Sequence, residues 1–320
     1  MKTIGVITTG GDAPGMNATI RAVTRIAHTN NLHVIGFERG WEGLLTNTFK
    51  HLTPRSVGGI IQLGGTMLHT SRCPEFKKPE SIKKAAERLA ANHVDGLVVI
   101  GGNGSLKGAV ELSRKTRSLI VGIPATIDND VFGSEETVGF DTAVNTAVGA
   151  IDKIRDTAIS HERIFVVEVM GRERGFLALS VGISVGAEVI LIPEKPCPIE
   201  TILEAIRENT RKGKRAGIIV AAEGVGNNSA LAENIEKRAK VEVRLSILGY
   251  AQRGGSPTVR SRLLASLFAE KAVELLCREE GNRVVGLQNG AVTSLDLEAS
   301  AGTEKPIDLR LMELAEMLST

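Results

Sequence analysis

The chain has 320 residues, 42% hydrophobic and 24% charged, which is ordinary for a globular protein and leaves room for two domains. A net charge of +2 and an aromatic content of 3% argue against nucleic-acid binding. No stretch approaches the about twenty apolar residues of a membrane span, and the first apolar run is too short for a signal peptide. Three widely spaced cysteines predict reduced thiols. We therefore expect a cytoplasmic protein.

Short apolar runs alternate with helical patterns along almost the whole chain. The runs predict strands at residues 2–8, 33–37, 95–100, 119–123, 163–170, 189–192, 217–222, 243–248 and 284–287. Helical patterns lie at about 14–29, 80–92, 104–115, 139–160, 198–212, 229–239 and 257–279. This alternation predicts an α/β fold with mainly parallel sheets.

Polar glycine loops follow several of the predicted strands. They read TTGGDAPG, GGNGS, PATIDND, MGRERG and AAEGVG. Ligands of open α/β sheets bind beyond the carboxyl ends of the strands, so these loops predict a composite site for two phosphorylated ligands. Any one loop could be an ordinary glycine turn between a strand and a helix, but five in one chain favour the site.

The first two loops are suited to phosphate. The loop around Gly11 opens a helix, where backbone N–H groups point towards an anion, although it is neither a Walker A loop nor a GxGxxG fingerprint. In the GGNGS loop, the Ser105 hydroxyl and backbone amides could contact a phosphate chain. Asn103 offers a neutral oxygen as a weak ligand to hydrated Mg²⁺. The alternative is a helix start capped by serine.

The segment Thr126–Asp130 has two carboxylates two residues apart. Phosphoryl transfer needs a carboxylate near the attacking hydroxyl and cations near the phosphates. Asp128 as the base and Asp130 near a metal ion would meet this need. An acidic turn that binds its own backbone is the alternative.

Several arginines lie beside loops or strand ends, where their forked guanidinium groups suit phosphate. They are Arg72, Arg163, Arg172, Arg244 and Arg253. Arg21 and Arg25 lie four residues apart on one predicted helix face, where an anion would relieve their repulsion. A solvated basic surface is the alternative in each case.

Taken in order, the motifs resemble those of bacterial ATP-dependent 6-phosphofructokinases, from residue 1 to about 315. The matching segments are GVITTGGDAPGMNATIR, SRCPEF, VVIGGNGS, TIDND, VEVMGR, EG and LGYAQRGGSP. The resemblance implies two Rossmann-like three-layer α/β/α domains with the active site in the cleft between them. A larger nucleotide-binding domain would comprise 1–138 and 251–305, and a smaller sugar-phosphate-binding domain 139–250 and 306–320.

The resemblance also implies a reaction in glycolysis and its residues. The γ-phosphate of ATP would pass to the 1-hydroxyl of fructose 6-phosphate, with Asp128 as proton acceptor and Mg²⁺ held by Asn103 and Asp130. The catalytic group would be completed by Thr126, Arg172 and Gly11. ATP would contact Gly11, Arg72, Cys73, Gly102, Asn103, Gly104, Ser105 and Gly108. The sugar phosphate would contact Thr126, Asp128, Met170, Gly171, Arg172, Glu223, Tyr250 and Arg253, with Arg163 and Arg244 supplied by a neighbouring subunit of a homotetramer.

The chain departs from the family pattern at several positions. Asn103 replaces an aspartate beside the metal, and Tyr250 replaces a histidine of the sugar site. Gly104 and Ala125 favour ATP, because users of pyrophosphate carry Asp and Lys there. An allosteric effector site would use Arg21, Arg25, Arg155, Gly186, Glu188, Lys212 and Lys214, whereas Pro54 and Ala216 replace two of its basic residues.

Two other functions are compatible with these residues. One is a related kinase that uses pyrophosphate or phosphorylates another sugar phosphate, such as sedoheptulose 7-phosphate. The other is a nucleotide sensor that has lost its chemistry through Asn103, which the retained Asp128 disfavours.

Overall fold

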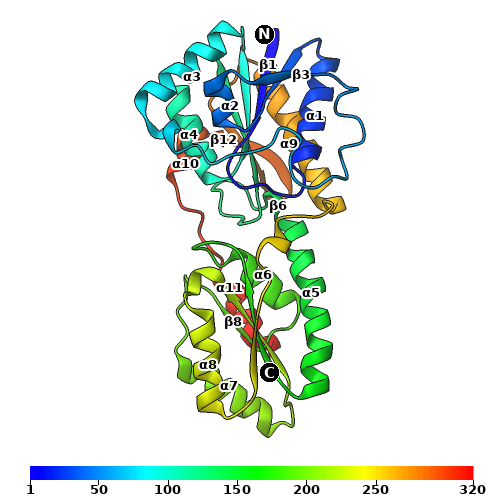
Figure 1. Cartoon of the computed structure of the whole chain (residues 1–320), viewed down its shortest axis with the longest axis vertical. Coiled ribbons are helices and arrows are strands. Elements are labelled where there is room, and N and C mark those ends of the chain that lie inside the picture. The colour runs from blue at the N-terminus through cyan, green and yellow to red at the C-terminus, as the bar shows by residue number, and fades with distance from the viewer. Residues whose placement is uncertain (320) are drawn as a thin grey trace. The chain divides into compact units, whose positions relative to one another are not determined.

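The computed structural model describes residues 1–319, which form two compact units (Figure 1). Unit 1 comprises Met1–Thr142 and Arg253–Lys305. Unit 2 comprises Ala143–Gln252 and the C-terminal segment that begins at Pro306. Helix α5 (Phe140–His161) begins in unit 1 and continues in unit 2.

Unit 1 contains an eight-stranded sheet. Its strands are β1 (Thr3–Thr8), β2 (His33–Phe37), β3 (Phe49–Leu52), β4 (Gly96–Gly101), β5 (Leu119–Thr126), β6 (Val138–Gly139), β11 (Arg283–Gln288) and β12 (Ala291–Asp296). They are ordered β12-β11-β5-β4-β1-β2-β3, and β6 pairs with the end of β5. The pairings are parallel except at the two edges, where β3 and β12 run antiparallel to their neighbours.

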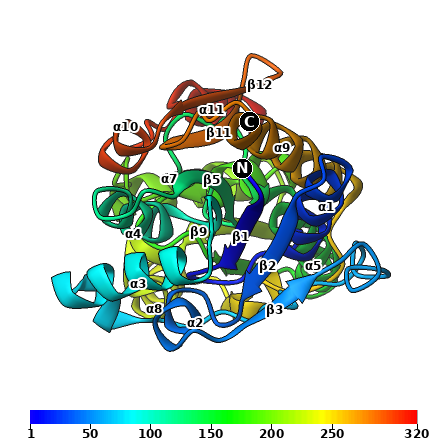
Figure 2. The same cartoon turned by 90° about the horizontal axis from the view of Figure 1, so that it is seen from above.

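Helices cover both faces of this sheet (Figure 2). Helices α1 (Met16–Thr29) and α9 (Val259–Cys277) pack together on one face, and α3 (Pro79–Ala91) and α4 (Asn103–Ser113) lie on the other. The shorter helices are α2 (Trp41–Thr46), η1 (Pro74–Lys77) and α10 (Leu297–Gly302). Every residue of β4 is buried, as expected for a parallel strand covered on both faces. Each fully buried Val or Ile side chain stabilises such a core by about 1.5–3 kcal/mol.

Unit 2 has a four-stranded parallel sheet. Its strands are β7 (Ile164–Val169), β8 (Val189–Leu191), β9 (Gly217–Ala222) and β10 (Val243–Ile247), in the order β10-β7-β9-β8. The remaining elements are α6 (Phe176–Ser184), α7 (Ile199–Arg211), η2 (Glu223–Val225), α8 (Asn228–Ala239), η3 (Gly249–Gln252) and α11 (Arg310–Leu318). Its core combines the strands with the apolar faces of α7 and α8.

The predicted α/β fold with mainly parallel sheets is confirmed, and the nine predicted strands occur with shifts of a few residues. The structure adds β3, β6 and β12 and helices α2, α6, α10 and α11. The predicted helix at 257–279 begins instead at Val259, because Thr258 is its N-cap and accepts a hydrogen bond from Ser261 N at 3.2 Å. Among residues 1–319, no helix has the length and apolarity needed to cross a membrane.

Candidate active site

Three of the predicted loops meet at one edge of the unit 1 sheet. Strands β5, β4 and β1 are neighbours and parallel, so the loops that follow them emerge side by side. The Thr9 N–H continues the ladder by donating to Ile100 O at 3.0 Å. Ser105 is buried and its hydroxyl donates to Thr9 O at 2.9 Å. This bond joins the first two loops; it also commits the Ser105 proton to the protein, and the N-cap of α4 is Gly102 rather than Ser105.

The loop after β5 carries the two aspartates. Thr126 and Asp128 are buried, with 7% and 3% of their surfaces exposed. The Thr126 hydroxyl accepts a hydrogen bond from the Asp128 N–H at 3.2 Å, and the Thr126 carbonyl accepts one from the Thr137 hydroxyl at 2.6 Å. A Cβ added at Gly102 would lie 3.2 Å from the Thr126 Cβ. The second glycine loop therefore lies directly against the loop that bears Asp128.

Asn103 is bound to this acidic loop. Its Nδ2 donates to the backbone carbonyl of Asp130 at 2.9 Å, and both residues are half-buried. The Asn103 side chain is thus held beside the backbone of Asp130. No cluster of three or more His, Cys, Asp or Glu in residues 1–319 could hold a metal ion. The predicted donors, Asn103 and Asp130, suit Mg²⁺, which in proteins binds one or two carboxylates and takes its other ligands from substrate phosphates and water.

Arg253 contacts the first glycine loop. Its Nη1 donates to Asp12 O at 3.2 Å, and a Cβ added at Gly11 would lie 2.6 Å from the same nitrogen. Only glycine at position 11 admits the guanidinium this close to the backbone. Unit 1 therefore combines Arg253, predicted to bind the sugar, with Gly11, predicted to bind the nucleotide.

The remaining residues predicted to contact ATP lie in differing surroundings. A Cβ added at Gly104 would meet nothing within 4 Å, so the space beside this residue is open. Gly108 packs against the buried Trp41, whose ring stacks on Phe76. Arg72 is exposed. Burial raises the pKa of the half-buried Cys73 thiol, which favours its neutral form.

In unit 2 the structure brings together the loops after β7 and β9. The Arg172 N–H donates to Glu223 Oε1 at 2.6 Å, and the Met170 N–H donates to Gln252 Oε1 at 3.4 Å. Gly171 has a φ of 131°, and a Cβ there would lie 2.6 Å from the Arg174 carbonyl. Glycine is therefore required at position 171. Tyr250 is 80% exposed, in η3.

Arg163 and Arg244 lie at the opposite, amino-terminal end of the unit 2 strands. Arg163 precedes β7, and β7 with its six residues spans about 20 Å before the loop at Met170. Glu242 lies between the two arginines: it forms an ion pair with Arg163 Nε at 2.6 Å and another with Arg244. The Arg163 hydrogen bond is the main cause that lowers the pKa of Glu242. Within unit 2, this pair is separate from the Met170–Glu223 group.

The residues predicted to bind an effector are divided between the units. Arg21 and Arg25 lie on α1 in unit 1. In unit 2, Lys214 pairs at 2.6 Å with Glu188, whose side chain is 6% exposed, and Arg155 donates to the Val185 carbonyl. Gly186 has a φ of 58°, and Lys212 pairs with Glu208 at 3.0 Å. A cavity of about 340 Å³ is lined by Arg155, Ile159, Lys214, Arg215 and Ala216.

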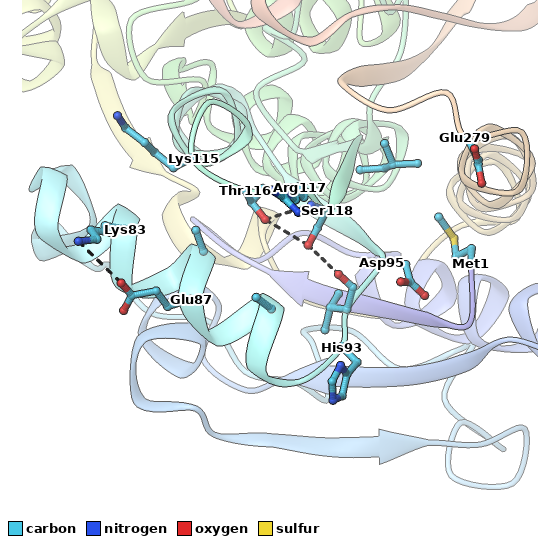
Figure 3. Close-up of a pocket in the computed structure, with 14 residues that line it drawn as sticks. Met1, Lys83, Glu87, His93, Asp95, Lys115, Thr116, Arg117, Ser118 and Glu279 are labelled. Atoms are coloured by element: carbon cyan, nitrogen blue, oxygen red, sulfur yellow. Dashed lines mark hydrogen bonds and ion pairs between the residues drawn. The ribbon is translucent and has the colours of Figure 1, made fainter.

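A large pocket of about 870 Å³ lies away from these loops (Figure 3). It is lined by residues that precede β1, β4 and β5, including Asp95 and Ser118, and by Lys83 and Glu87 of α3. It therefore lies at the amino ends of the strands, whereas the candidate residues of unit 1 follow their carboxyl ends. Its charged lining includes both signs.

Comparison with known proteins identifies the family. The phosphofructokinase family profile matches residues 3–276. The chain belongs to the phosphofructokinase family. The resemblance in the sequence motifs is thereby confirmed.

Full-length relatives and solved structures agree with this membership. The chain is 51% identical to an ATP-dependent 6-phosphofructokinase of Persephonella marina and 47% identical to one of Bacillus mycoides, each covered over 100% of both chains. It matches the phosphofructokinase structure from Saccharomyces cerevisiae with a TM-score of 0.88 and 34% identity, over 94% of this chain and 45% of the yeast chain. A pyrophosphate-dependent phosphofructokinase from Marinobacter aquaeolei matches with a TM-score of 0.86 at 21% identity, over 97% of this chain and 86% of that one, and so shows the fold alone.

Sequence reasoning did not single out three residues that contact candidate site residues or the loop that carries them. Thr137 binds the Thr126 carbonyl, Glu242 binds both Arg163 and Arg244, and Lys305 binds the Asn129 carbonyl at 2.8 Å. The family resemblance runs as far as Lys305, but none of the three lies in a glycine loop or beside another notable motif.

Proposed function

We propose that the chain is an ATP-dependent 6-phosphofructokinase of glycolysis, which transfers the γ-phosphate of ATP to the 1-hydroxyl of fructose 6-phosphate. The products are fructose 1,6-bisphosphate and ADP. Full-length relatives at 47–51% identity carry this name. The structural observation that supports it is the buried Asp128 on a loop that packs against a phosphate-type glycine loop.

In the proposed mechanism, Asp128 accepts the proton of the 1-hydroxyl as that oxygen attacks phosphorus. The Asp128 N–H bond to the Thr126 hydroxyl fixes the backbone on which the base stands. The hydroxyl oxygen of Thr126 can still accept a bond, and its proton can point to the transferred phosphoryl group. Arg172 is proposed to stabilise the charge on that group. Such catalysis consists mainly of positioning and electrostatic stabilisation.

The nucleotide is proposed to lie along the glycine loops of unit 1, with its phosphates against Gly11 and the start of α4. Backbone N–H groups at a helix start attract phosphate. Asp130 and the Asn103 amide oxygen would hold Mg²⁺, which when bound neutralises phosphate charge. The open space at Gly104 supports the choice of ATP, because a side chain at this position is what the pyrophosphate users of the family carry.

The sugar phosphate is proposed to contact the Met170–Arg172 loop and Glu223 in unit 2, together with Arg253. In this proposal, unit 1 is the nucleotide-binding domain and unit 2 is the sugar-phosphate-binding domain. Arg163 and Arg244, at the far end of their strands, are proposed to bind the 6-phosphate in a neighbouring subunit. A homotetramer in the cytoplasm, regulated through the cavity at Lys214, completes the proposal.

Another sugar substrate is the second candidate. Tyr250, which stands where the family has a histidine of the sugar site, is 80% exposed. A larger sugar phosphate, such as sedoheptulose 7-phosphate, is therefore worth testing beside fructose 6-phosphate.

The test is a coupled assay of purified wild type and Asp128→Asn with each sugar phosphate, with ATP or pyrophosphate as donor. We expect turnover with ATP and fructose 6-phosphate, and a loss of about 10²–10⁴-fold in kcat for Asp128→Asn, as for other removed proton acceptors. Asp152→Asn, an exposed change on α5, is the matched control and should keep full activity.

Three results would contradict the proposal. Full activity in Asp128→Asn would exclude Asp128 as the base. Faster turnover with pyrophosphate than with ATP would exclude ATP as the preferred phosphoryl donor. ATP binding without turnover of either sugar would favour the nucleotide sensor.

A further inference from the structure

The loop that bears Asp128 is held by a residue that is distant in the sequence. Lys305 is the last residue of this unit, 176 positions after Asn129. Its ammonium donates to the Asn129 carbonyl at 2.8 Å and to the Glu135 carbonyl at 3.1 Å. Lys305 therefore joins two points of one loop that are six residues apart.

The Asn129 carbonyl belongs to the peptide bond that joins Asn129 to Asp130. Asn129 itself lies between the two aspartates of the loop, directly after Asp128. Asn129 has a φ of 52°, in the left-handed region, which asparagine adopts more readily than other non-glycine residues but still at some cost. A charge-assisted bond to this carbonyl fixes the orientation of the peptide, and with it the directions in which both carboxylates leave the backbone.

Other bonds close the same loop through the Asn129 side chain. The Asn129 side chain donates to Glu135 O and accepts from Thr137 N, each at 3.1 Å. These bonds fix the loop through its side chains and its base. The Asn129 and Asp130 carbonyls are held by Lys305 and Asn103, respectively.

We propose that Lys305 is a positioning residue for the base Asp128. It acts on the backbone of the loop, and not on the substrate. This inference rests on the proposed function, because it assigns to Lys305 the task of holding Asp128 at the attacking hydroxyl. Catalysis is sensitive to such placement, since a shift of about 1 Å in a reacting group can cost about 100-fold in rate.

The test compares Lys305→Met and Lys305→Arg with the wild type. Methionine keeps the length of the side chain without a donor, whereas arginine keeps the charge and can donate to both carbonyls. We expect Lys305→Met to lose about 10- to 100-fold in kcat, with the KM values for ATP and fructose 6-phosphate within about threefold. Lys305→Arg should recover most of the lost kcat. Lys115→Met, an exposed change beside the pocket of Figure 3, is the control.

A double-mutant cycle separates positioning of Asp128 from general support of the fold. If Lys305 acts through Asp128, Lys305→Met should cost less than about threefold in the Asp128→Asn background. An equal loss in both backgrounds would overturn the proposal, as would full activity in Lys305→Met. If Lys305→Met does not fold, Lys305→Gln, which keeps a donor without the charge, takes its place in the cycle with the same criteria.

The same measurements distinguish this proposal from the proposed function. A wild type without turnover would overturn both. An active wild type with an inactive Asp128→Asn variant and a fully active Lys305→Met variant would overturn the role of Lys305 alone.

Discussion

At the scale of single residues, Asn103 does two things that an aspartate in its place could not combine. Its Nδ2 donates to the Asp130 carbonyl, while its oxygen stays available to a cation. An aspartate would accept and not donate, so it would face that carbonyl with a negative charge. The Asn103 amide therefore stabilises the loop that contains Asp130, but it supplies no negative charge to the proposed Mg²⁺ site, as an aspartate would.

The variant Asn103→Asp tests this exchange. We expect half-maximal activity at a severalfold lower Mg²⁺ concentration, because a carboxylate is the stronger ligand. We also expect the free energy of unfolding to fall by about 1 kcal/mol, as is usual for a lost hydrogen bond. Titration of activity with Mg²⁺ and urea unfolding measure the two effects. Asn103→Ala is the control, with the stability loss but without the improved Mg²⁺ response; an unchanged response in Asn103→Asp would contradict the charge argument.

At the scale of elements, the starts of β1 and β4 are joined by Asp95. Its Oδ2 accepts from Lys2 N at 2.5 Å and from Thr3 N at 3.0 Å, next to the pair formed by Ile4 and Gly96. Burial by itself would raise the pKa of Asp95, but the two backbone N–H groups outweigh it and lower the pKa. The ionised carboxylate is thus the form that the fold favours.

We expect Asp95→Ala to lower the free energy of unfolding at pH 7 by about 1 kcal/mol or less, since the site is exposed. The folded pKa lies below the unfolded one, so this stabilisation is complete above the unfolded value of about 3.9 and is lost as the pH falls through the folded pKa. Urea unfolding of both proteins at pH 7 and near pH 3 measures the difference. Asp95→Asn, which keeps an acceptor, should lose less; a difference that grows at low pH would refute the argument.

The elements that sequence reasoning missed lack the patterns that would have predicted them. Strand β12 (AVTSLD) is a partly polar edge strand and β3 has only four residues, so neither shows a continuous apolar run. Helix α6 (FLALSVGIS) is almost entirely apolar, and a helix that is buried all round has no amphipathic period to reveal it. The central parallel strands were predictable because burial on both faces requires Val and Ile at nearly every position.

At the scale of the whole molecule, the proposed site needs residues from two copies of the chain. Asp128 would act in its own subunit, whereas Arg163 and Arg244 would serve a neighbour. In a random mixture of Asp128→Asn and Arg244→Ala chains, an intact site forms wherever an Arg244→Ala subunit receives Arg244 from an Asp128→Asn neighbour. Each variant alone lacks such sites.

We therefore expect that refolding the two variants together in equal amounts restores about a quarter of wild-type activity, the chance that a site combines the two intact halves. The coupled assay measures the restored activity, and sedimentation gives the size of the oligomer. Mixing Asp128→Asn with the double variant should restore nothing. If the first mixture also stays inactive while forming oligomers, the site lies within one chain.

The sequence by itself determined the α/β class, the central strands and the family. These follow from local apolar runs and from the residue sequences of the glycine-loop motifs. It also picked out Asp128, whose role stays a prediction. Only the tertiary structure decided which groups hold that aspartate's loop. Lys305 reaches Asn129 across 176 residues, and Asn103 turns its amide to the Asp130 carbonyl. A hydrogen bond between distant residues depends on the positions of the donor and acceptor atoms in the folded chain, and the periodicity of the sequence does not reveal these positions.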